Sequence, residues 1–221
     1  MKAKISEIFK SIQGEGVYQG QEQAFVRFYG CNLKCVFCDT KLNSYSEKTV
    51  EEVFEKICSF DEVASVSLTG GEPLLNWKFI KLLSPFLSES GKLIHLETNG
   101  VLYNNLKEII DFIDIVAMDF KFPSSTKNPE VWNEHKEFLK VALKKEVFVK
   151  AVIGKDTTCE DVFESIKIIK ELKANIPFIL QPENPFENFL IPKLTHFEEI
   201  YKGKDIDVRI LPQLHKMLDI K

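Results

Sequence analysis

The sequence predicts an α/β fold: a partial, open TIM-like (βα) barrel of about six or seven mostly parallel strands. Three observations predict it. Strand and helix patterns alternate along the chain, one side of the strands is apolar and the other polar, and the polar residues gather near the strand C-termini. A doubly wound sheet is apolar on both faces, whereas barrel enzymes carry their polar sites at the carboxyl ends of the strands. A flat sheet with solvated edge strands remains the alternative.

The alternation has the spacing of βαβ crossovers, which favours parallel pairing. The predicted strands cover residues 24–29, 63–69, 93–98, 115–120, 146–153, 177–181 and 206–211. Thr49 and Glu52 form a capping-box pattern, Pro129 suits the first turn of a helix, and Thr158 suits an N-cap. The predicted helices cover residues 49–59, 75–88, 104–110, 129–144, 158–173 and 194–201.

Alternate residues of a strand face opposite sides of the sheet. The apolar side should carry the helices, and it comprises Val26, Phe28, Val66, Leu68, Ile94, Leu96, Val116, Met118, Val149, Ala151, Val208 and Ile210. The opposite side should line a ligand site, and it comprises Arg27, Ser67, Thr69, His95, Glu97, Asp119, Lys121, Lys150, Gln181, Asp207 and Arg209.

Length and composition predict one soluble domain over residues 1–221. The net charge is −4 with no long basic run, so we expect no nucleic-acid partner. No apolar run reaches the roughly 18 residues of a membrane span, and the N-terminus lacks an apolar signal region. Five cysteines, an odd number, indicate a reduced cytoplasmic protein. Arginine occurs only at Arg27 and Arg209, where either a bidentate contact or a structural ion pair is expected.

Three cysteines, Cys31, Cys35 and Cys38, follow the first predicted strand with the spacing C-x3-C-x2-C. Three soft sulfur ligands on one loop favour a metal site. A structural zinc site normally has four protein ligands, so three without an obvious fourth favour an iron–sulfur cluster with one open position. Cys58 and Cys159 lie in predicted helices, and we expect them to be buried apolar side chains.

Further polar turns end the next three predicted strands. Residues 69–73 read Thr-Gly-Gly-Glu-Pro, residues 97–100 Glu-Thr-Asn-Gly, and residues 119–121 Asp-Phe-Lys. The glycines permit close backbone approach to a ligand, and a carboxylate there can accept from an ammonium group. Because these turns meet at one end of the sheet beside three thiols, we expect them to form one site.

The cysteine spacing, Phe37 before the last cysteine and the Gly-Gly-Glu-Pro turn resemble the radical S-adenosylmethionine (SAM) superfamily. The resemblance implies a [4Fe–4S] cluster held by Cys31, Cys35 and Cys38, with SAM bound at the fourth iron. It also implies one-electron cleavage of SAM to a 5′-deoxyadenosyl radical, fed by a flavodoxin- or ferredoxin-type reductant.

Residues 11–16 (SIQGEG), Arg27, residues 38–40 (CDT), Gln181-Pro182 and residues 211–216 (LPQLHK) resemble the 7-carboxy-7-deazaguanine synthase family. That family converts 6-carboxy-5,6,7,8-tetrahydropterin to 7-carboxy-7-deazaguanine with loss of ammonia, on the path to queuosine. The resemblance implies substrate contacts from Ile12, Gln13, Gly14, Glu15, Arg27, Thr69 and His215. It implies cofactor contacts from Phe37, Cys38, Asp39, Gly71, Glu72, Thr98, Asn99, Asp119, Phe120, Lys121, Gln181 and Pro182. It further implies Mg²⁺ at the Thr40 hydroxyl and a homodimer.

Two other functions stay open at this point. A glycyl-radical activase shares the cysteine spacing but acts on a partner protein. A zinc-stabilised binding module could complete its ligand set with Cys58 or His95. The sequence leaves undetermined the roles of His95, Glu97 and Arg209, the C-terminal substrate contact, the dimer surface and how the short segment after Thr40 shields the cluster.

Overall fold

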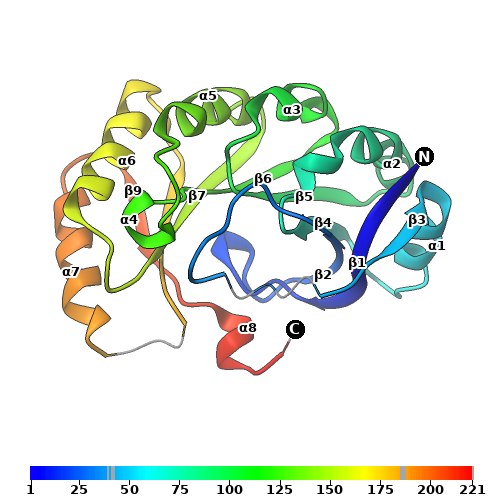
Figure 1. The fold of residues 1–221 in the computed structure, drawn as a ribbon, viewed down its shortest axis with the longest axis horizontal. Coiled ribbons are helices and arrows are strands. Elements are labelled where there is room, and N and C mark those ends of the chain that lie inside the picture. Colours follow the sequence, from blue (N-terminus) through cyan, green and yellow to red (C-terminus); the bar gives the residue numbers. More distant parts are fainter. Residues whose placement is uncertain (39, 41–42, 185–187, 221) are drawn as a thin grey trace.

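The computed structural model describes residues 1–38, 40, 43–184 and 188–220, and it contains a nine-stranded mixed sheet. The strand order is β3-β1-β2-β4-β5-β6-β7-β8-β9, so the sheet curls into an arc whose edges, β3 and β9, are not paired with each other (Figure 1). All neighbours from β2 to β9 pair in parallel. The predicted open barrel is therefore confirmed.

The seven parallel strands coincide with the seven predicted ones. They are β2 (Glu22–Phe28), β4 (Ser65–Gly70), β5 (Leu93–Thr98), β6 (Ile115–Asp119), β7 (Glu146–Ile153), β8 (Pro177–Pro182) and β9 (Asp207–Ile210). Each is short and carries apolar residues, most of them β-branched or aromatic residues or leucine, which is why the sequence pattern located them.

Two antiparallel strands, β1 (Lys2–Ile12) and β3 (Ser46–Thr49), were not predicted. The pairing of β1 with β2 shifts register between Ile5 and Glu7, which interrupts the alternation of the two faces. Ala3 and Ile5 therefore pack in the outer core, whereas Glu7 and Phe9 line the inside of the arc. The bulge hides the period of two in the sequence, and β3 has only four residues.

The longer helices form a layer around the outside of the arc (Figure 1). They are α1 (Val50–Cys58), α2 (Trp77–Glu89), α3 (Tyr103–Lys107), α5 (Trp132–Ala142), α6 (Cys159–Glu171) and α7 (Leu190–Tyr201). Two single-turn helices, α4 (Pro123–Thr126) and α8 (Leu214–Met217), and 3₁₀ turns at Gly16–Tyr18, Pro73–Asn76 and Ile110–Phe112 lie in the connections. Capping boxes start α1 at Thr49 and α6 at Thr158, as the sequence predicts. Among the helices in the described ranges, α4 and α8 lacked a signal in the sequence, because each is a single turn.

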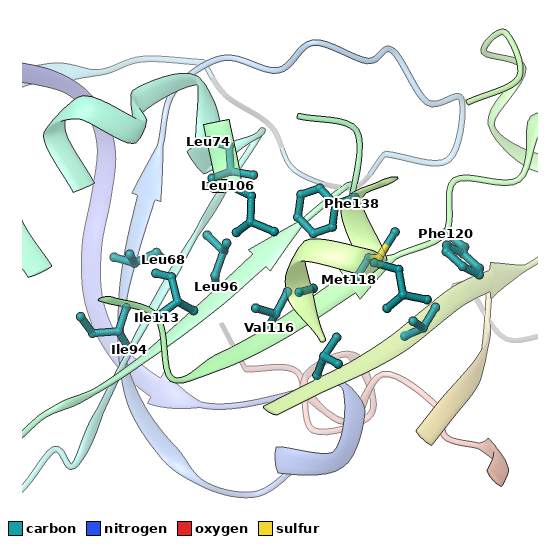
Figure 2. Close-up of a cluster of buried hydrophobic side chains, with 14 of the residues drawn as sticks. Leu68, Leu74, Ile94, Leu96, Leu106, Ile113, Val116, Met118, Phe120 and Phe138 are labelled. Atoms are coloured by element: carbon teal, nitrogen blue, oxygen red, sulfur yellow. The ribbon is translucent and has the colours of Figure 1, made fainter. Parts of the chain in front are cut away.

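The main core lies between the outer face of the sheet and these helices. Figure 2 shows Leu68, Leu96 and Val116, which come from three adjacent strands, in one cluster with Leu106 and Phe138 of the covering helices. All these side chains are buried. The predicted apolar side of the strands is thus the side that the helices cover, and its burial is the largest stabilising contribution to the fold.

The base of the inner face is apolar, and there Ile115, Ala117, Phe148 and Ile179 form a small separate cluster. Above this cluster, polar residues of neighbouring strands lie side by side. The strand pairing places Arg27 opposite Thr69 and Asp119 opposite Lys150. The interior therefore has a hydrophobic floor and polar walls.

The last strand departs from the prediction of a ligand-lining polar face. Arg209 and Asp207 are exposed on β9 and pair with each other at 2.6 Å and 3.1 Å. Because β9 is the open edge of the arc, its inner side is exposed in the part of the chain that the structure describes. Arg209 therefore makes a structural ion pair outside the site.

The two remaining cysteines also differ from expectation: Cys58 is exposed at the end of α1 and Cys159 is half-buried at the start of α6. Helix ends face solvent here, so Cys58 lies outside the core, whereas Cys159 packs against the edge of the main core. None of the helices in the described ranges combines the length and apolar character that crossing a bilayer requires.

Candidate active site

One large cavity, of about 960 Å³ among the described residues, opens at the carboxyl ends of the strands. Its volume lies within the range of small-molecule sites. Most of the predicted site residues line it. They are Ile12, Gln13, Gly14, Glu15, Arg27, Cys31, Cys35, Phe37, Cys38, Thr40, Thr69, Gly71, Thr98, Asn99, Asp119, Lys121, Gln181 and His215.

Three predicted cofactor contacts have side chains elsewhere, and a fourth falls outside the described residues. Phe120 is buried in the outer core with its ring stacked on His135 at 5.0 Å. Pro182 ends β8 away from the cavity lining, and Glu72 is completely buried beneath it. Asp39 belongs to the residues that the structure does not describe. Contacts from these four positions stay predictions.

The cysteine loop leaves β2 and packs against the two glycines that end β4. Gly70 has φ of +134°, and a Cβ there would lie 2.2 Å from the Phe28 carbonyl oxygen. A Cβ on Gly71 would lie 2.1 Å from the Gly30 carbonyl oxygen and 2.9 Å from Cys31 Cβ. The glycines are therefore needed to let one chain segment approach another, which seats the cysteine loop on the sheet.

The three thiols all face the cavity and are free. Burial raises the pKa of Cys31 and of Cys35, so both are protonated at neutral pH until a metal displaces the protons. Among the described residues, no three Cys, His, Asp or Glu side chains are placed to bind a single metal ion. Zinc requires such convergence on one ion, whereas a four-iron cluster takes one thiolate at each of three irons. The three cysteine thiols therefore suit a [4Fe–4S] cluster.

Glu72 braces two of the loops around the cavity. Its carboxylate accepts hydrogen bonds from the backbone N–H of Leu74 at 3.1 Å, from Thr98 Oγ1 at 2.8 Å and from the backbone N–H of Asn99 at 2.8 Å. Burial raises the pKa of Glu72 to about 7 despite these donors. The glutamate of the Gly-Gly-Glu-Pro turn therefore holds the β4 and β5 turns together from below.

A chain of buried charges crosses the cavity wall. Lys150 pairs with Glu15 and lies 3.6 Å from Asp119, and Lys121 pairs with Asp119 at 2.7 Å. Glu15 also accepts hydrogen bonds from Gln181 and Gln213. Burial alone would raise the pKa of Glu15, but the charge and hydrogen bond of Lys150, together with Gln213 and His215, outweigh burial and lower the pKa to about 2. Each buried charge thus has an opposite charge beside it.

Glu97 forms the second polar centre. Its carboxylate accepts from Gln13 Nε2 at 2.8 Å, Ser67 Oγ at 2.7 Å and Thr69 Oγ1 at 2.8 Å. Burial opposes its charge, but the basic groups of His95 and Lys150 and the Gln13 amide lower its pKa below the ordinary range. Glu97 is therefore a partly buried carboxylate anion in the cavity, suited to accepting hydrogen bonds from N–H groups of a heterocycle.

Arg27 reaches the cavity from β2. Its Nε donates to Glu7 Oε1 at 2.7 Å, and its guanidinium lies 5.5 Å from the centre of the Phe9 ring, which stacks on Phe25. Glu7 and Phe9 hold the guanidinium from one edge and one face. Within the described part of the chain, the edge formed by the two terminal nitrogens is left to meet a second carboxylate.

The two end motifs meet at the mouth of the cavity, where the segment around α8 contacts the residues that follow β1 (Figure 1 shows α8 below β2). Leu214 N donates to the Gly14 carbonyl at 2.8 Å, and a Cβ on Gly14 would lie 2.0 Å from His215 Nδ1. Gln213 Nε2 donates to Glu15 at 2.6 Å. Gly14 therefore lets the C-terminal segment close over the N-terminal motif, and His215 reaches the cavity rim.

Several cavity residues were given no specific role from the sequence. Lys150 and Glu97 were predicted only to lie on the polar face that should line a ligand site, and both line the cavity. Gln213 lies within a motif that the resemblance covered. Glu7 and Phe9 sit in β1 beyond its bulge, where the sequence offered no pattern.

Comparison with known proteins agrees with this geometry. The Radical SAM superfamily profile matches residues 25–190. The 7-carboxy-7-deazaguanine synthase of Geobacter sulfurreducens is 33% identical over 98% of this chain and 97% of that protein, and that of Archaeoglobus fulgidus is 34% identical over 100% of both. The chain belongs to the radical SAM superfamily and, within it, to the 7-carboxy-7-deazaguanine synthase family. Membership of the superfamily implies a [4Fe–4S] cluster and SAM.

Solved structures agree on the fold. QueE from Escherichia coli matches with a TM-score of 0.67 at 20% identity, over 95% of this chain and 94% of that one. SuiB from Streptococcus suis, bound to its precursor peptide SuiA, matches with a TM-score of 0.61 at 18% identity, over 86% of this chain and 48% of that one. Within the family, the open barrel is therefore the expected architecture.

Behind the cavity, His135 joins the turns after β5 and β6 to the core. It is completely buried, and its Nε2 lies 3.1 Å from the carbonyl oxygen of Asn99. The imidazole also stacks on Phe120, between the β6 loop and helix α5. Burial lowers the pKa of His135 to about 3, so the imidazole is neutral at ordinary pH. Because the Asn99 carbonyl can only accept, Nε2 carries the proton and donates to it.

We predict that His135 makes the fold sensitive to acid. Folding lowers the pKa of His135 from 6.5 to about 3. The contribution of the neutral imidazole to the free energy of unfolding is therefore complete above pH 6.5 and is lost as the pH falls towards 3. Between pH 8 and pH 4 the wild-type protein should lose roughly 3 kcal/mol more unfolding free energy than His135→Phe. Urea unfolding across this range measures the difference. Parallel pH curves for the two proteins would contradict the assignment.

Proposed function

We propose that this protein converts 6-carboxy-5,6,7,8-tetrahydropterin to 7-carboxy-7-deazaguanine with loss of ammonia, as a carbon–nitrogen lyase formed by residues 1–221. The carrying observation is that one cavity contains both the three cysteines and Arg27, so a cofactor and a small carboxylate can lie side by side. Its relatives along the full chain are named as 7-carboxy-7-deazaguanine synthases. When bound, the cluster and SAM supply one-electron reduction of the sulfonium and a 5′-deoxyadenosyl radical.

The cofactor half of the cavity is built by the strand ends nearest the cysteine loop. Cys31, Cys35 and Cys38 would hold the cluster, and Asn99 and Lys121 lie on the same wall. Lys121 is fixed by Asp119 at 2.7 Å and lies 5.5 Å over the ring of Phe37. These residues would orient SAM and exclude water, which is the protein's part in cofactor chemistry.

The substrate half is polar and suits a reduced pterin. The ring system of a reduced pterin carries several N–H groups, and Glu97 can accept hydrogen bonds from them. Gln13 is held in place because it donates to the same carboxylate. Arg27 would bind the substrate carboxylate through its two terminal nitrogens while Glu7 holds Nε. Ile12, Gly14 and Glu15 complete this wall, and His215 would cover it from the C-terminal segment.

Mg²⁺ is proposed at the Thr40 hydroxyl, with substrate oxygens and water completing the coordination. Thr40 lines the cavity and follows Cys38 by two residues, and a hard cation binds hydroxyl oxygen ligands of this kind. The ion would offset negative charge that develops on the substrate oxygens during rearrangement.

We also propose a cytoplasmic homodimer supplied by a flavodoxin- or ferredoxin-type donor. What supports the donor is the exposure of Cys31 and Cys38 on one face of the molecule, where an electron-transfer protein can approach. The homodimer and the location rest on family resemblance. Light scattering that gives the mass of a monomer would contradict the dimer.

The deciding experiment is anaerobic reconstitution followed by assay. We expect a brown protein with about four irons and four sulfides per chain. With SAM, reductant, Mg²⁺ and the carboxytetrahydropterin, it should form the deazapurine product, identified by mass. An intact cluster without product would contradict the synthase, and a colourless protein that holds only zinc would contradict the whole assignment.

Arg27→Lys should raise KM for the pterin by roughly 10- to 100-fold, because lysine cannot make the paired contact worth about 1.5–3 kcal/mol. SAM cleavage to 5′-deoxyadenosine without substrate should change little. Arg209→Lys is the matched control, since Arg209 pairs with Asp207 outside the cavity. Equal KM values for all three proteins would remove Arg27 from the substrate site.

Thr40→Ala should weaken the dependence of product formation on Mg²⁺, so that a higher concentration is needed for half-maximal rate. Thr40→Ser keeps a hydroxyl and should titrate like the wild type. A Mg²⁺ titration of turnover at saturating substrate compares the three. If the alanine variant shows an unaltered midpoint, Thr40 is only structural.

A further inference from the structure

The segment that contains α4 runs beside the cysteine loop. Val36 N donates to the Thr126 carbonyl at 3.2 Å, and Lys34 N donates to Asn128 Oδ1 at 3.1 Å. Residues 126–128 thus hold residues 34–36 on both sides of Cys35. None of these later residues belongs to a motif that the sequence analysis singled out.

The orientation of the Asn128 amide follows from its partners. The backbone N–H of Lys34 can only donate, so the amide oxygen must face it. The amide nitrogen then faces two acceptors, Cys35 Sγ at 3.4 Å and the Thr126 carbonyl at 3.4 Å. An N–H of Asn128 therefore points at the sulfur of a cluster ligand.

The support of Asn128 is rigid. Thr126 is completely buried, and its hydroxyl accepts from Asn128 N at 3.2 Å. Ser125 shares a 2.7 Å hydrogen bond with Thr157, and Lys127 pairs with Asp156 at 3.0 Å, which attaches α4 to the turn after β7. The amide is consequently held in place by the sheet on the far side of the cysteine loop.

The other two cluster cysteines lack a comparable side-chain donor in the described ranges. Cys31 accepts from the backbone N–H of Leu33 at 3.4 Å, and Asn99 Nδ2 is farther away, at 3.9 Å. Cys38 lies 3.9 Å from the Thr40 carbonyl, which cannot donate. Asn128 therefore makes the shortest side-chain contact to a cluster sulfur among these residues.

We propose that Asn128 is a positioning residue that raises the reduction potential of the [4Fe–4S] cluster through its N–H···S hydrogen bond to Cys35. A donor at a ligand sulfur draws electron density from it and so stabilises the reduced, more negative cluster. The proposal rests on the cluster that family membership implies and is independent of the pterin substrate.

The test is a redox titration of the reconstituted protein, followed by the electron paramagnetic resonance signal of the reduced cluster. Asn128→Asp keeps an acceptor for Lys34 N but loses the donor to sulfur, and Asn128→Leu loses both. Asn105→Leu is the control, because Asn105 donates to the Leu74 carbonyl and to no cysteine. Both Asn128 variants should titrate at more negative potential, with a roughly tenfold lower ratio of reduced to oxidised cluster at fixed potential, which is about 59 mV for one electron.

Three results would overturn the proposal. Both Asn128 variants could titrate with the wild type, which removes the hydrogen bond as a determinant of the potential. Only Asn128→Asp could shift, which assigns the effect to the added charge. Both variants could fold, as shown by circular dichroism, but retain no iron, which makes Asn128 a residue that builds the loop. A shift in both variants with the control unchanged supports the proposal.

Discussion

The buried ion pairs that link Glu15, Lys150, Asp119 and Lys121 are the interaction on which the cavity depends. A buried charge without a partner is costly, so each of these side chains requires the next one along the wall. The chain joins the N-terminal motif to β7 and β6, and Gln213 extends it to the C-terminal segment. Elements that are far apart in the sequence are thereby held around one space.

The cysteine loop depends on its surroundings in the same way. It has little secondary structure of its own, and its position is set by Gly71 beneath it, Asn99 at one side and Asn128 at the other. Asn99 donates to Asn32 Oδ1 at 2.8 Å, and Glu72 holds the backbone of Asn99 from below. The loop is thus pre-organised by the turns after three different strands, and such support from neighbouring elements is how a functional site keeps its geometry.

An open barrel has consequences for both edges. At β9 the inner face is exposed, and Arg209 forms a local pair with Asp207. At the other edge the antiparallel strand β1 extends the arc, and its bulge turns Glu7 and Phe9 towards Arg27. The arginine in the enclosed part of the arc can bind a ligand, whereas the arginine at the open edge cannot reach the cavity. The two arginines therefore differ in function because the sheet encloses one of them and not the other.

The sequence by itself determined the seven parallel strands, the apolar and polar sides of the sheet and the clustering of Cys31, Cys35 and Cys38 with the polar turns. These are local patterns, because alternation along a strand and spacing along a loop are readable without knowing the fold. Only the tertiary structure decided that Glu72 braces loops, that Lys150 neutralises Glu15 and that Asn128 donates to Cys35. Those contacts join residues from different elements, and they depend on register, on a β-bulge and on single-turn helices, which leave no period in the sequence.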